Sequence, residues 1–184
     1  MHKRLILLVV LALTAIAVKG QSKHWQLGRA PSSDELRQRD ITVLPNGAGL
    51  PDGRGTAVEG EVVYRNKCLS CHGTNQEGTW PLIGGVGTLG SANPVKTVGS
   101  YWAYSTSIWD YVRRGMPFDK PGTLSPDEVY QVTAFLLYRN GIIGQNEVMT
   151  RETLPKVRMP NRDGFIPDGR PDVGNKPRAS RSQN

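Results

Sequence analysis

The sequence predicts an all-α fold, with one small domain of three to four helices between irregular N- and C-terminal extensions. Helix-start patterns, in which Ser or Thr precedes an acidic residue by three positions, begin at Thr56, Ser107 and Ser125. Glycine and proline, which interrupt regular elements, number 21 and 13 and are frequent in both extensions. Apolar residue types make up only 38% of the 184 residues, so we expect a bound apolar group to complete the core.

Residues 1–20 are predicted to be a signal peptide. The basic residues Lys3 and Arg4 precede an apolar segment, residues 5–18. As a helix this segment would rise only about 21 Å, short of a membrane core of roughly 30 Å. We therefore favour cleavage after Gly20 and a periplasmic protein without a stable membrane span; the alternative is an uncleaved anchor.

Composition divides the rest of the chain into an irregular arm, the helical domain, an extended C-terminal arm and a disordered tail, at residues 21–55, 56–141, 142–173 and 174–184. Within the first arm, only residues 33–39 have the composition of a short helix, with Ser33 as the expected N-cap.

The first and last core helices have the clearest start signals. Thr56 and Glu59 form a capping box, as do Ser125 and Glu128, with Pro126 at the first helical position. Gly60 and Tyr64 share one face of the first helix, and glycine there allows another helix to approach closely. We expect Phe135 of the last helix to pack against them.

A shorter helix is predicted between these two. Its expected N-cap is Ser107, with Asp110 closing the box, and Gly115 is its stop signal. Residues 73–100 are rich in glycine and are expected to form a loop that lies against a flat group.

The chemistry is concentrated in the segment Cys68-Leu69-Ser70-Cys71-His72. C-x-x-C-H is the attachment pattern of a c-type haem, in which two thiols bind the vinyl groups and the histidine binds the iron. A structural zinc site needs four ligands, and His24 is the only further Cys or His beyond residue 20. A redox dithiol would leave His72 unexplained. The sequence therefore predicts three to four helices around one covalently bound haem c.

Met116 is the preferred iron ligand opposite His72, because it follows a helix end and Pro117 stiffens its turn. The other candidates are His24, Met149 and Met159, which lie outside the helical domain. His/Met ligation raises the reduction potential and leaves no open iron position. We therefore expect one-electron transfer, with no catalytic residue, rather than an enzyme acting on thiosulfate or peroxide.

Three further residues are candidates for haem contacts. The carbonyl of Pro81 is expected to accept the second ring N–H of His72, as iron-bound histidines generally require. Trp102 and Tyr104 are candidates for hydrogen bonds to a haem propionate, with buried aromatic packing as the equal alternative.

These pieces together resemble class I cytochromes c over residues 56–141. A narrower resemblance, over residues 31–173, is to the cytochrome subunits of bacterial sulfite dehydrogenases and of sulfur dehydrogenases of the thiosulfate-oxidising system. The segments that carry it are Asp40–Pro45, Gly49–Pro51, Gly99–Trp102, Arg113–Phe118 and Met159–Phe165. This resemblance implies a molybdenum-cofactor dehydrogenase subunit as electron donor. Some members of the family carry two haems, whereas this chain has one C-x-x-C-H segment, and Gly115 stands where alanine is expected.

The charge is concentrated at the C-terminus. Residues 21–150 contain 12 basic and 12 acidic residues, whereas residues 151–184 contain 8 and 4. Without a basic helix or an aromatic platform, this distribution argues against nucleic-acid binding. The leading hypothesis is an electron-accepting subunit that passes electrons to a downstream cytochrome or oxidase. The alternative is a freely diffusing shuttle to a terminal oxidase.

Overall fold

The computed structural model describes residues 28–74 and 81–166. The predicted signal peptide and the tail 174–184 lie outside the described residues. Contacts divide the chain into two units, Met1–Asp40 and Ile41–Asn184. No helix of the described residues is both long and apolar enough to span a membrane.

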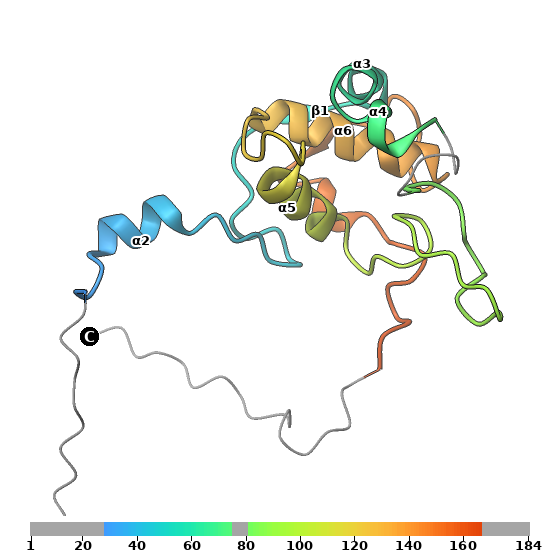
Figure 1. Ribbon diagram of the computed structural model, residues 1–184, viewed down its shortest axis with the longest axis horizontal. Coiled ribbons are helices and arrows are strands. Elements are labelled where there is room, and N and C mark those ends of the chain that lie inside the picture. Colours follow the sequence, from blue (N-terminus) through green and yellow to red (C-terminus); the bar gives the residue numbers. More distant parts are fainter. Residues whose placement is uncertain (1–27, 75–80, 167–184) are drawn as a thin grey trace, which may run out of the picture. The chain divides into compact units, whose positions relative to one another are not determined.

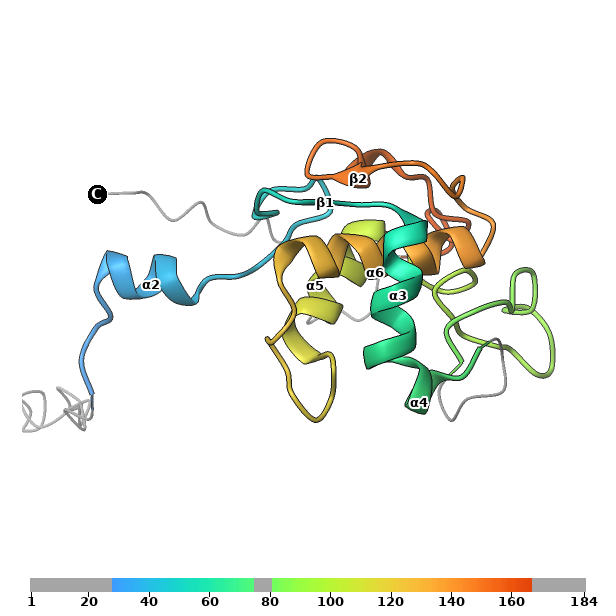
Figure 2. The same ribbon diagram turned by 90° about the horizontal axis from the view of Figure 1, so that it is seen from above.

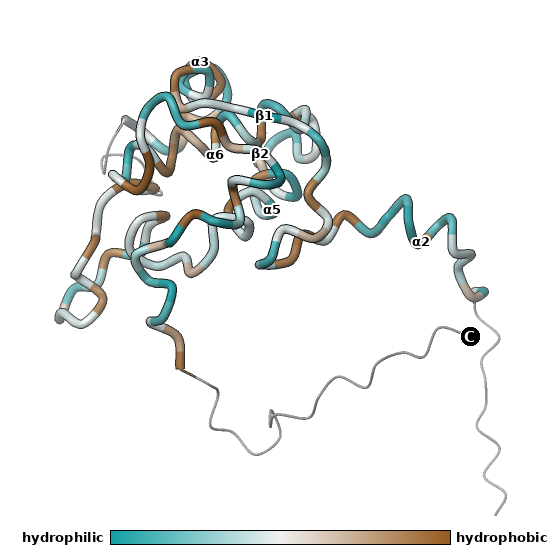
Figure 3. Tube along the Cα trace, turned by 180° about the vertical axis from the view of Figure 1, so that it is seen from behind, coloured by the Kyte–Doolittle hydropathy of each residue, from teal (hydrophilic) through white to brown (hydrophobic). Residues whose placement is uncertain are grey.

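The described part of the first unit holds one short helix, α2 (Ser33–Arg39). Its N-cap is Ser32, so the expected cap at Ser33 is wrong by one residue. The reason is that Glu35 lies three positions after Ser32 and its carboxylate accepts the Ser32 backbone N–H at 2.8 Å, which closes the capping box. None of the α2 residues is buried, and the helix is hydrophilic along most of its length in Figure 3.

The described residues of the second unit form four α-helices, α3 (Ala57–Lys67), α4 (Leu69–His72), α5 (Ser105–Gly115) and α6 (Pro126–Arg139). Figures 1 and 2 show α3 running across α6, with α5 packed on the other side of α6. The predicted all-α class is confirmed. Both predicted capping boxes of α3 and α6 are present, at Thr56 and Ser125.

The crossing of α3 and α6 depends on a glycine. Gly60 is buried, and a Cβ added there would overlap the carbonyl of Gln131 and lie 2.8 Å from the Cβ of Phe135. One turn further along α3, the Tyr64 ring packs on Phe135 with 5.0 Å between ring centroids. The expected packing of Phe135 against Gly60 and Tyr64 is therefore confirmed.

Helix α5 begins three residues before the predicted start. Its N-cap is Tyr104, which makes no side-chain capping bond, and Ser107 lies inside the helix, so the predicted cap at Ser107 is wrong. Asp110 does not close a capping box, because its carboxylate accepts the backbone N–H of Val43 and the side chain of Arg114 instead. The long-range hydrogen bond from the Val43 N–H to Asp110 thus takes the place of the predicted local capping bond.

The segments on either side of the helices also pack into the core. Arg54–Gly55 (β1) pairs antiparallel with Met149–Thr150 (β2), a pairing that the sequence did not predict. A 3₁₀ turn, η1 (Leu154–Lys156), follows. The buried side chains supplied by these segments are Val43, Leu50, Met149, Leu154 and Met159.

Gly60→Ala is predicted to destabilise the protein by about 2 kcal/mol, because the added methyl group forces α3 and α6 apart. Gly115→Ala is the matched control, since a Cβ at this helical glycine would meet nothing within 4 Å. We expect the control to be neutral or stabilising by about 0.5 kcal/mol. Denaturant unfolding measures both, and equal stabilities of the two variants would contradict the packing at Gly60.

Candidate haem site

The two cysteines flank a single helical turn. Cys68 ends α3 and is also the N-cap of α4. The backbone N–H groups of Cys71 and His72 donate to the Cys68 carbonyl at 3.2 and 3.0 Å. Gly73 ends the turn with a φ of 68°, in the left-handed region that favours glycine. The turn therefore holds Cys68 and Cys71 three positions apart on one side of a helix, with His72 beside them.

The two thiols lie in different environments. Cys68 packs against the hydrophobic core, and burial raises its pKa to about 11, whereas Cys71 is exposed. Cys68 and Cys71 are not joined by a disulfide. An activated redox cysteine has a lowered pKa, because the thiolate is the reactive form. The environment of Cys68 therefore suits a neutral sulfur in an apolar setting better than a redox thiolate.

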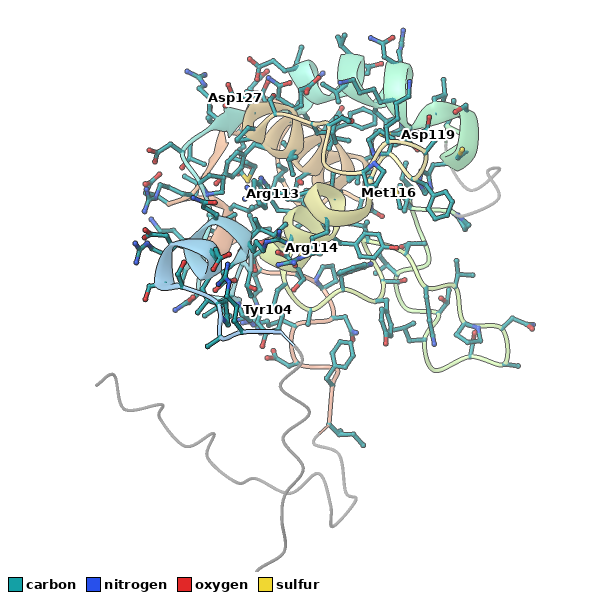
Figure 4. The ribbon with its side chains drawn as sticks, turned by 60° about the vertical axis from the view of Figure 1, so that its left-hand side comes forward. Tyr104, Arg113, Arg114, Met116, Asp119 and Asp127 are labelled. Carbon is teal, nitrogen blue, oxygen red and sulfur yellow. The ribbon has the colours of Figure 1, made fainter. Side chains whose placement is uncertain are left out.

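Met116 lies at the C-terminal end of α5, as Figure 4 shows. Its backbone is extended and its N–H donates to the Val112 carbonyl, while its half-buried side chain packs against the same core as Cys68. Met149 and Met159 are 2% and 1% exposed inside that core, where they fill volume. His24 lies outside the described residues.

A loop network that the sequence analysis missed is held by Asn140. The Asn140 side chain accepts the backbone N–H of Gly84 at 2.9 Å and donates to the carbonyls of Leu82 and Leu136 at 3.1 and 2.8 Å. The glycine at position 99 makes room for the Asn140 side chain, because a Cβ on Gly99 would overlap it. In the sequence, the dipeptide Asn140-Gly141 indicates only a helix stop. A polar residue at the end of an apolar helix was the available signal.

The three lesser candidates are found in different settings. Pro81 is half-buried at the start of the loop that Asn140 holds. Trp102 meets Tyr111 edge to face, with ring centroids 5.7 Å apart, and the Arg162 guanidinium lies 4.1 Å from the centre of the Tyr104 ring. Tyr104 and Met116 cap opposite ends of α5, as Figure 4 shows. At the helical rise of about 1.5 Å per residue, the two caps are about 18 Å apart along the helix axis. Haem contacts of all three remain predictions.

The donor set of the described residues fits a covalently bound haem. It comprises two thiols and an imidazole on one turn and a thioether at a helix end, which is the chemistry of a c-type centre. Apolar side chains from six separate segments also pack on the core yet stay partly exposed, as expected where a flat apolar group would cover part of this surface. They are Cys68, Leu69, Leu82, Trp102, Met116, Ile142, Ile143 and Val157.

Comparison with known proteins agrees with this chemistry. Residues 55–136 match the family described as cytochrome c oxidase, cbb3-type, subunit III. The solved structure of the sulfane dehydrogenase SoxCD from Paracoccus pantotrophus contains a chain 42% identical to this one, with a TM-score of 0.72; the match covers 86% of this chain and 82% of that one. The thiosulfate dehydrogenase of Thiomonas intermedia (strain K12) is 28% identical over 131 residues, or 67% of this chain and 38% of that protein. The chain thus spans well under half the length of that curated relative.

Fold, site and comparisons define an electron-carrying c-type cytochrome, whose cofactor is haem c. The chain belongs to the class I cytochrome c family, and within it to the cytochromes related to the matching chain of the sulfane dehydrogenase structure. The family resemblance predicted from the sequence is confirmed. The chain transfers electrons and is not itself the catalytic enzyme.

Asn140→Ala is predicted to loosen the loop at residues 82–84, because it removes three hydrogen bonds and leaves the half-buried backbone N–H of Gly84 without its acceptor. We expect a loss of about 2 kcal/mol in unfolding free energy and faster amide exchange at Gly84. The exposed Asn146→Ala is the control. If Gly84 is protected equally in both variants, Asn140 does not hold the loop.

Proposed function

We propose that this chain is a mono-haem cytochrome of the bacterial periplasm. Cys68 and Cys71 form the two thioethers, and His72 and Met116 are the axial ligands. The observation that carries the proposal is the α4 turn, which presents both thiols and the imidazole within five residues of one helical segment. The bound haem supplies a one-electron couple whose potential is raised by His/Met ligation.

The protein residues hold this group and keep water away from it. Met116 lies on the apolar core, and burial of its side chain favours a thioether, which is a weak ligand that water would otherwise replace. Pro81, Trp102 and Tyr104 are proposed to orient His72 and the propionates.

We further propose that the cytochrome accepts electrons from a molybdenum-cofactor subunit that oxidises a sulfur compound, and passes them to a downstream cytochrome or oxidase. Two observations support this partner. The related solved chain comes from a sulfane dehydrogenase, and the curated relative is a thiosulfate dehydrogenase. The match to the sulfane dehydrogenase chain covers 86% of this chain and so extends well beyond residues 55–136, which match the general cytochrome family.

Met116→Ala is predicted to remove the axial thioether without releasing the haem, because both thioether bonds remain. The reduction potential should fall by more than about 60 mV, equivalent to at least a tenfold shift in the redox equilibrium. Potentiometric titration followed by visible spectroscopy measures this. The control is Met149→Leu, a volume-conserving change in the core. An unchanged spectrum in Met116→Ala would refute the ligand assignment.

Reduction by a dehydrogenase tests the proposed partner. We expect the native cytochrome to co-purify with a molybdenum-containing protein and to be reduced when a sulfur substrate is added to that complex. A cytochrome that elutes alone, and is reduced equally well by several unrelated donors with a steep dependence on salt, would instead be a diffusing shuttle.

A further inference from the structure

Two side chains from different helices hold the backbone that directly follows His72. The Tyr64 hydroxyl, on α3, donates to the Gly73 carbonyl at 2.7 Å. The Arg139 guanidinium, at the end of α6, donates to the Thr74 carbonyl at 2.9 Å. Gly73 and Thr74 are the first two residues after the histidine. Their carbonyls are therefore fixed by both of the helices that cross at Gly60.

The two donors are parts of one packed stack. The Tyr64 ring lies 5.0 Å from the Phe135 ring, and the Arg139 guanidinium lies 5.6 Å from the Phe135 ring on the same helix. Tyr64 is 2% exposed, and its burial raises its pKa to about 12, so the hydroxyl keeps its proton and remains a donor. Because the donors lie on different helices, any change in the crossing of α3 and α6 would shift the two donors relative to each other.

We infer that Tyr64 and Arg139 are positioning residues for the axial ligand His72, an inference that rests on the proposed function. They fix the exit of the α4 turn and so set the orientation of the imidazole. Arg139 has a second effect through its charge. A fixed positive charge close to the haem site disfavours the oxidised, more positive state, and so raises the reduction potential.

The test uses the full-length haem protein with three variants. Tyr64→Phe keeps the ring and removes only the donor. Arg139→Lys keeps the charge but loses the planar fork, and Arg139→Gln loses both. We expect the amide protons of His72 and Gly73, which close the α4 turn, to exchange about fivefold faster in all three variants. The hyperfine-shifted NMR signals of the His72 ring should also move.

The charge effect is measured separately. At a fixed ambient potential, the ratio of reduced to oxidised protein should fall about threefold in Arg139→Gln and stay near the wild-type value in Arg139→Lys. A double-mutant cycle of Tyr64→Phe with Arg139→Lys should be non-additive in the exchange rates, because both donors hold the same turn.

The matched control is Tyr130→Phe. Tyr130 is also buried on a helix, and its hydroxyl donates to a backbone carbonyl, that of Pro51, at 2.9 Å. Arg151→Gln, which removes an exposed guanidinium paired with Asp52, controls for charge. If Tyr64→Phe changes the His72 signals and exchange no more than Tyr130→Phe does, the inference fails while the haem assignment stands. A wild-type protein without bound haem would instead refute the proposed function.

Discussion

The close crossing of α3 and α6 at Gly60 is the contact on which the remaining structure depends. The missing side chain lets the backbone of α3 approach Gln131, and this approach brings Tyr64 against Phe135. A crossing of two helices through a glycine and an aromatic pair buries area without needing a large core. Such a crossing suits a chain in which apolar residue types make up only 38% of the sequence.

The same crossing links the fold to the site. The α4 turn directly continues α3, so the position of Cys68 follows from the position of α3 on α6. Hydrogen bonds from Tyr64 and Arg139 then connect the two crossing helices to the backbone that follows His72. On the opposite side, Met116 is set by the end of α5, which packs on α6 as well. One helix, α6, therefore supports both proposed axial ligands, and this arrangement suits a group that changes charge without moving.

Features with local signals were predictable from the sequence. The starts of α3 and α6 were found because each capping box lies within four residues, and C-x-x-C-H has a fixed spacing. The failures involve contacts between distant residues. The Asp110 carboxylate accepts the backbone N–H of Val43 instead of closing a capping box on α5. Strand β1 pairs with β2, which lies almost a hundred residues further along the chain. The roles of Arg139 and Asn140 depend on which loop folds back onto α6, and a single sequence does not contain that information.

The central claim is that one haem is covalently bound to Cys68 and Cys71. Intact-mass spectrometry of the purified protein, before and after acid–acetone extraction, tests it most directly. We expect the mass to exceed that of the polypeptide by one haem, and the pigment to remain with the protein after extraction, because thioether bonds survive this treatment. The account would be contradicted if the pigment passed into the acetone and left the mass of the polypeptide alone. A purified protein with the mass of the polypeptide without haem, or with two haems, would also contradict it.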